Sequence, residues 1–190
     1  KQRIPCIHTV AAAKAAAGEE EIPFSSSPDR EAAPEPLAPP YIALTWEGLN
    51  QAQAGNLRPP VTHGAVGRGY YLEIVNSRLA FYSANTGAQL IPSVSLASFF
   101  NYSTETIFDP RVVFDKVWRR WIVTAEAFEE SDTVQYFFIA ISQNENPTRG
   151  ASKWYVYRVN VNFTTTNYFW DFPQVGHDQD AVIFTANIFA

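Results

Sequence analysis

Apolar and polar residues alternate with a period of two along most of the chain after residue 60. The clearest stretches are GYYLEIVNS (69–77), RLAFYSANTGAQL (78–90), RRWIVTAEAF (119–128) and KWYVYRVNV (153–161). Successive side chains of a strand point to opposite faces of a sheet, so this alternation predicts β-strands. YFFIAI (136–141) is apolar on both faces, which is typical of a central strand. No helical pattern follows residue 60, and the sequence predicts an all-β fold over 61–190.

Residues 1–60 have a different composition, with eight prolines between Pro23 and Pro60. This pattern predicts an extended, low-complexity Pro/Ala-rich arm over 1–60. Within it, the alanine-rich stretch after Thr9 predicts a short helix over 9–17 that Gly18 ends. A segment that cannot build its own core is ordered only when something holds it, so we expect the arm to dock on the folded part or on a partner.

Two segments of the folded part repeat each other at a spacing of 63 residues. FDPRVVFDKVWRRWIV (108–123) and DFPQVGHDQDAVIFTANIF (171–189) both predict a strand, a polar turn and a second strand, and THGAVGRGYYLEIVNS (62–77) is a weaker third copy. The alignment places Pro110 on Pro173, Val112 on Val175, Asp115 on Asp178 and Trp121 on Phe184. Four antiparallel strands per repeat at this spacing predict about two and a half blades of an incomplete β-propeller.

These segments resemble successive blades of a group of large secreted bacterial β-propeller proteins, most of them without a known activity. The HGAVG segment (63–67), the FDPRVVFD…RRW blade and the DFPQVG blade (171–176) carry the resemblance. It implies a secreted protein of the periplasm, cell surface or extracellular space. Members of that group have several further blades, so we expect the remaining blades in the same polypeptide or in an assembly.

The composition limits the classes of partner that the chain is expected to bind. The net charge is −5, which disfavours nucleic-acid binding because phosphate recognition needs a basic face. No apolar run approaches the ~20 residues of a membrane span. Cys6 is the only cysteine, which excludes an internal disulfide and a cysteine-rich metal site.

Asp109 and Glu126 are the two catalytic candidates. Asp109 and Asp171 begin equivalent strands, which favours a structural role such as capping backbone amides. The Asp109 segment also resembles the first blade of arabinanase-like five-bladed glycoside hydrolases. That resemblance implies Asp109 as general base, with Glu126 as a candidate general acid. Inverting hydrolysis needs two carboxylates about 6.5–9.5 Å apart.

The segment GHDQDA (176–181) is a candidate metal site. It places His177, Asp178 and Asp180 close together, and two carboxylates in a loop can bind Ca²⁺ if carbonyls and water complete the shell. The alternative is a polar turn, because Asp115 opens a turn at the equivalent position.

The leading functional hypothesis is a secreted, non-catalytic propeller that acts as a scaffold or protein-interaction module, with no cofactor other than Ca²⁺. The alternatives are a propeller glycosidase that uses Asp109 and Glu126, and a carbohydrate-binding lectin whose exposed aromatic residues stack on a glycan.

Overall fold

The computed structural model describes residues 41–148, 153–162 and 168–189. Contacts along the chain separate two units, Lys1–Tyr41 and Ile42–Ala190. Almost all of the expected arm, including the helix expected over 9–17, lies outside the described residues.

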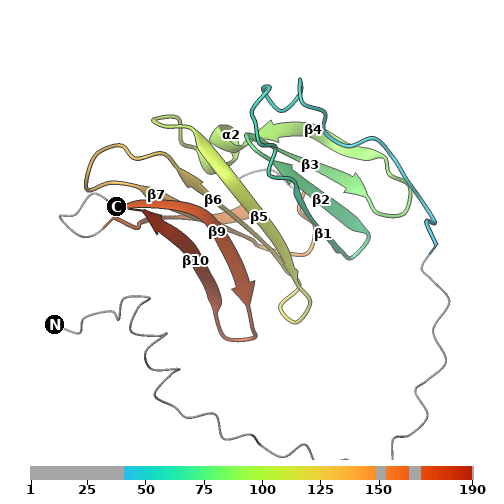
Figure 1. The fold of residues 1–190 in the computed structure, drawn as a ribbon. Helices are drawn as coiled ribbons and strands as arrows, with labels where there is room; N and C mark the ends of the chain where they lie inside the picture. Colours follow the sequence, from blue (N-terminus) through green and yellow to red (C-terminus); the bar gives the residue numbers. More distant parts are fainter. Residues whose placement is uncertain (1–40, 149–152, 163–167, 190) are drawn as a thin grey trace, which may run out of the picture. The chain divides into compact units, whose positions relative to one another are not determined.

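Three antiparallel sheets follow one another along the chain (Figure 1). Sheet 1 has the order β1 (His63–Gly67), β2 (Tyr70–Val75), β3 (Arg78–Ser83), β4 (Gln89–Ser95). Sheet 2 has the order β5 (Ile107–Asp115), β6 (Arg120–Ala127), β7 (Tyr136–Ser142), β8 (Trp154–Asn160). Sheet 3 has β9 (Phe169–His177) and β10 (Val182–Phe189). The all-β prediction and the four-stranded antiparallel sheets are therefore confirmed.

The predicted hairpins occur where alternating strands meet turn residues. The segment ANTG (84–87) joins β3 to β4, and Gly87 has a φ of 71°, a left-handed value that glycine adopts without steric cost. The weaker copy also folds as predicted, because β1 and β2 pair from Gly67–Tyr70 to His63–Ile74.

One helix contradicts the expectation that none follows residue 60. Helix α2 (Leu96–Phe100) begins after Ser95, whose side chain accepts a hydrogen bond from the Ser98 amide. It ends at Asn101, which is left-handed at φ 51°. Five residues are too few to show a helical period, and this is why the sequence pattern missed it.

Helix α2 connects sheet 1 to the outer strands of sheet 2. Phe99 packs edge-to-face on Trp154 of β8 at 5.1 Å, and Phe100 packs on Phe138 of β7 at 5.1 Å. The main core cluster lies between these two sheets and includes Leu72, Leu79, Val112, Trp121, Val123 and Phe138. The first strands of the sheets are neighbours, since β1 contacts β5 and β5 contacts β9.

Strands β5 and β9 carry the same irregularity at equivalent places. In β5, Asp109 and Pro110 together oppose one residue of β6, because the register jumps from Phe108–Glu126 to Arg111–Thr124. Such a two-against-one arrangement is a β-bulge, which bends a strand and re-aims its side chains. Asp109 has a φ of 47°.

In β9, Phe172 and Pro173 form the corresponding bulge, with a register jump between Thr185 and Asn187 of β10. Phe172 has a φ of 53°, similar to that of Asp109. The alignment of Pro110 with Pro173 is therefore confirmed.

The alignment of Trp121 with Phe184 is wrong. Val112 pairs with Val123 in sheet 2, and its equivalent Val175 pairs with Phe184 in sheet 3. Phe184 thus corresponds to Val123, because the β9–β10 hairpin has two fewer residues between the paired positions. Equivalent residues are therefore 63 positions apart in the first strand of the repeat and 61 positions apart in the second.

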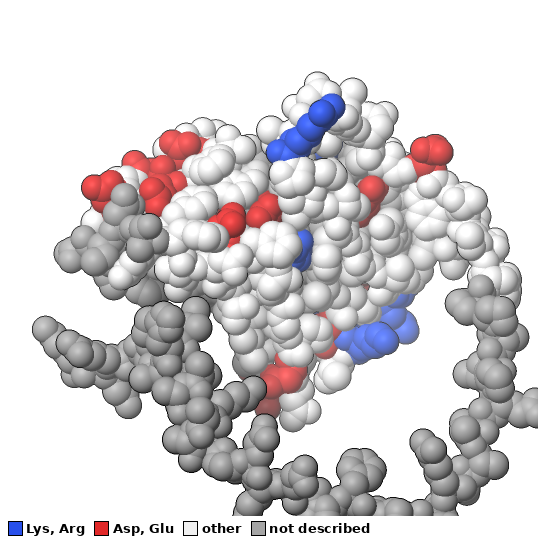
Figure 2. All heavy atoms as spheres, viewed as in Figure 1, with Lys and Arg blue, Asp and Glu red and all other residues white. Residues whose placement is uncertain are grey.

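Figure 2 shows several acidic side chains gathered at the upper left of the visible face and basic side chains in separate places, without a continuous basic patch. Within the described residues, no helix is both long and apolar enough to span a membrane.

Candidate functional site

Three carboxyl groups meet where sheet 2 contacts sheet 3. Asp109 of β5, Glu126 of β6 and Asp171 of β9 each place one oxygen within 4.8 Å of the others. Glu126 is 1% exposed and Asp109 is 7% exposed, while Asp171 is half-buried. The two bulges produce this convergence, because Asp109 lies in the β5 bulge and Asp171 immediately precedes that of β9. We call these three side chains the carboxyl cluster.

Backbone amides of the bulges fix the carboxyl cluster. The Phe172 amide donates a hydrogen bond of 3.0 Å to Oε1 of Glu126, which joins β9 to β6. The Asp109 amide donates to Oδ1 of Asn76 at 2.8 Å, and Nδ2 of Asn76 donates to the Pro59 carbonyl at 2.8 Å. Asn76 thereby connects sheet 1 to sheet 2.

Burial and mutual repulsion shift Glu126 and Asp109 toward their protonated forms. Removal from water, followed by the nearby charge of Asp109, raises the pKa of Glu126 to about 9. Removal from water and the charge of Asp171 also raise the pKa of Asp109. Glu126 is therefore protonated at neutral pH in the folded chain.

Arg111 is the nearby positive group, and it opposes the rise in pKa at both Asp109 and Glu126. Its guanidinium lies over the Phe172 ring at 4.7 Å, and its Nε is buried without a hydrogen-bond partner. Among the described residues, Arg111 forms no ion pair within 4.0 Å of a carboxylate. The cluster thus has one neighbouring positive charge for three acidic groups.

The carboxyl cluster can bind a proton or a hard cation. Carboxylate oxygens are the ligands that Ca²⁺ takes in proteins, so Asp109, Glu126 and Asp171 are the side chains that could hold such an ion. A shared proton relieves the same repulsion without an ion.

The geometry does not fit inverting glycoside hydrolysis. The facing oxygens lie within 4.8 Å, which is shorter than the roughly 6.5–9.5 Å that an inverting pair needs. The near-complete burial of Glu126 and Asp109 also leaves little surface against which a sugar ring could lie. Asp109 and Glu126, which the glycosidase hypothesis paired, do come together, but in a buried junction.

His177, Asp178 and Asp180 lie at the β9–β10 turn. Oδ1 of Asp178 accepts hydrogen bonds from the Asp180 and Ala181 amides, both at 2.8 Å. Oδ1 of Asp115 accepts from Val117 and Trp118 in the same way at the β5–β6 turn. The two aligned aspartates therefore both cap turns, and Nδ1 of His177 lies 3.8 Å from Oδ2 of Asp115.

Sequence reasoning did not place Asp171 beside Asp109 and Glu126, and it missed Asn76 and Arg111, which interact with the carboxyl cluster. The repeat already aligned Asp171 with Asp109 within one residue, and two aspartates beginning neighbouring first strands could have suggested that they meet. Nothing local to Asn76 or Arg111 indicated their positions, because Asn76 in the β2–β3 turn and Arg111 in β5 contact residues that are far from them in the sequence.

Replacing Asn76 by alanine tests the connection between the sheets. The Asn76→Ala variant leaves the buried Asp109 amide without its acceptor, so we expect a loss of about 2 kcal/mol in the free energy of unfolding. Urea denaturation followed by tryptophan fluorescence measures it. Asn85→Ala, at the exposed β3–β4 turn, is the control and should change stability little. An equal effect at both positions would contradict the role of Asn76.

The sequence matches no protein family model, and neither the curated proteins nor the solved structures contain a match.

Proposed function

We propose that this chain contributes blades to a β-propeller that acts as a secreted, non-catalytic scaffold for protein interaction. The neighbouring first strands β1, β5 and β9 support the propeller, because blades pack with their first strands around a common axis. The repeated bulges support the equivalence of sheets 2 and 3. The secreted location rests on the family resemblance of the HGAVG, DPRVVFD and DFPQVG segments.

The difference between the two faces of sheet 2 carries the proposal. On the face toward sheet 1, Phe138 and Ala140 of β7 are 0% exposed. Sheet 1 and helix α2 cover this face as far as Trp154 at the start of β8, which is buried against Phe99, whereas Val156 farther along β8 is 40% exposed.

Sheet 3 covers only the inner half of the opposite face. Phe137 is 1% exposed and stacks on Phe184 of β10 at 4.3 Å. Farther out, Tyr155 and Tyr157 of β8 are 55% and 52% exposed. They pair with Ile141 and Ile139 of β7, and these four side chains form what we call the open face.

The open face fits a pair of antiparallel strands. Within the described residues β10 pairs only with β9, so its other edge has backbone groups able to pair with a further strand. Two strands added there would extend sheet 3 to the four-strand width of sheets 1 and 2 and cover Tyr155 and Tyr157. The proposed occupant is therefore an apolar-faced strand pair from another blade or a partner protein.

Sedimentation velocity on the 190-residue chain tests the open face. We expect concentration-dependent self-association, because an uncovered strand edge beside an apolar face pairs with other copies. The double variant Tyr155→Glu/Tyr157→Glu should sediment as a monomer. Leu90→Glu is the matched control, since Leu90 is an exposed apolar residue of the outer strand of sheet 1.

Two results would count against the proposal. One is a wild-type chain that remains monomeric up to its solubility limit. The other is association that persists in the double variant, which would place the contact elsewhere.

A further inference from the structure

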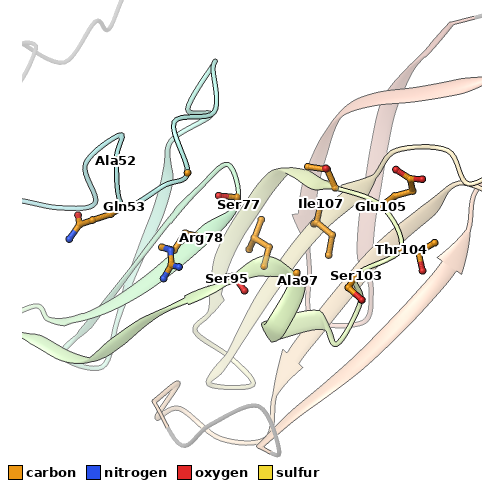
Figure 3. Close-up of a pocket in the computed structure, with 13 residues that line it drawn as sticks. Ala52, Gln53, Ser77, Arg78, Ser95, Ala97, Ser103, Thr104, Glu105 and Ile107 are labelled. Atoms are coloured by element: carbon orange, nitrogen blue, oxygen red, sulfur yellow. The ribbon is translucent and has the colours of Figure 1, made fainter.

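A cavity of about 570 Å³ lies at the junction of sheets 1 and 2 and shares no residue with the carboxyl cluster or the open face. Four segments line it, namely the β2–β3 turn, the β4–α2 junction, the loop over 103–107 and the turn over 52–55 (Figure 3). Its volume falls within the roughly 300–1,000 Å³ typical of small-molecule sites.

Hydroxyl groups are the most frequent polar feature of this cavity. They belong to Ser77, Ser95, Ser103, Thr104 and Thr106. The hydroxyls of the last three form no hydrogen bond with any other described residue. A hydroxyl both donates and accepts, so these groups can match a ligand that carries hydroxyls of its own.

Two oppositely charged side chains flank the hydroxyls. Nη1 of Arg78 donates to the Ser93 carbonyl and to Oγ of Ser93, both at 3.0 Å, which holds the guanidinium in place. Figure 3 shows Arg78 and Glu105 on opposite sides of Ile107 in this view. No ion pair joins them within the described part of the chain, so both can donate to or accept from a ligand.

The cavity also has an apolar wall. Its exposed members are Ala52 and Ala97, because Leu96 and Ile107, which also line it, belong to the buried core at 0% and 3% exposure. A pyranose ring presents hydroxyls at its edge and C–H groups on its faces, and this wall suits the C–H face. Planar Arg and Glu side chains can each bond two neighbouring hydroxyls of one sugar.

We infer that this cavity binds a sugar unit of a glycan. Other ligand classes fit less well. Glu105 repels an anion, and the net charge of −5 disfavours nucleic acid. The many polar groups disfavour a lipid, which would leave them without partners. The inference does not depend on the propeller scaffold, because the cavity and the open face share no residue.

Saturation-transfer NMR on the 190-residue chain tests the inference, with chitotriose, cellotriose, xylotriose and mannotriose as probes and glycylglycine as a zwitterionic comparison. We expect transfer to at least one trisaccharide. Glu105→Gln and Thr104→Ala should each weaken its binding about tenfold, because the first removes the negative charge that strengthens a hydrogen bond from a sugar hydroxyl and the second removes a hydroxyl partner. Thr62→Ala removes an exposed hydroxyl outside the cavity and should leave binding unchanged.

Three results would overturn the inference. They are an absence of transfer to all four trisaccharides, transfer to glycylglycine alone, and sugar binding that is the same in the Glu105→Gln and Thr104→Ala variants as in the wild type. The sedimentation of the Tyr155→Glu/Tyr157→Glu chain is a separate measurement. Failure of the sugar site and failure of the scaffold are therefore distinguishable.

Discussion

As the pH rises from about 5 to about 9, the Glu126→Gln variant should lose much less stability than the wild type. The pKa of Glu126 rises from 4.5, its ordinary value, to about 9 in the folded chain. Between these values the folded state binds a proton that the unfolded state has released. The free energy of unfolding must therefore fall as pH rises through this window.

The size of the stability loss follows from the size of the pKa shift of Glu126. One pKa unit corresponds to about 1.4 kcal/mol, so the full shift sets an upper bound of about 6 kcal/mol. Water entry and relaxation around the ionised carboxylate reduce this energy. We therefore expect the free energy of unfolding of the wild type to fall by about 3 kcal/mol over this pH range. Glutamine cannot ionise, but its oxygen can still accept the Phe172 amide hydrogen bond.

Urea denaturation at pH 5, 7 and 9, followed by tryptophan fluorescence, measures this difference. Glu47→Gln is the matched control, because Glu47 is an exposed glutamate and its replacement should leave the pH dependence of the wild type intact. If the Glu126→Gln chain loses as much stability as the wild type, the titrating group is not Glu126.

The second large effect is expected for Phe138→Ala, at about 3–5 kcal/mol of lost stability. Phe138 is 0% exposed and contacts the rings of Phe100 and Tyr102 at 5.1 and 5.0 Å. Arg158 also lies over its ring at 5.7 Å. Because a domain is stable by only about 5–15 kcal/mol, this loss is a large share of the total.

Tyr157→Ala is the control on the opposite face of the same sheet. Tyr157 is 52% exposed, and we expect its truncation to cost about 1 kcal/mol or less. Thermal and urea unfolding of both variants provide the comparison. Equal losses would mean that the open face is covered in solution, and self-association of the purified chain would then be the first explanation to examine.

The strands and turns were predictable because their signals are local. Alternation predicted the strand pairs, and the repeat aligned Pro110 with Pro173, which both lie in bulges. Helix α2 was not predictable, since LASFF is too short to show a period and Phe99 and Phe100 are in contact with rings of β7 and β8.

The candidate site was predictable only in part. Asp109 and Glu126 were proposed as site residues from a family resemblance. Their contact with Asp171 depends on how β9 packs against β5 and β6. The burial that raises the pKa of Glu126 is a tertiary effect that a strand pattern does not contain. The exposure of Tyr155 and Tyr157 likewise depends on the width of sheet 3.

The two-residue difference between the β5–β6 and β9–β10 hairpins has a consequence for how this repeat can diverge. Removing one residue from each arm of a hairpin deletes one complete rung of the ladder, and every remaining side chain keeps its face. Removing a single residue would instead exchange the buried and exposed faces of one strand. Phe184 still reaches Phe137 because the change was even. We therefore expect length variants of these hairpins to fold when they differ by whole rungs and to fail when they differ by one residue.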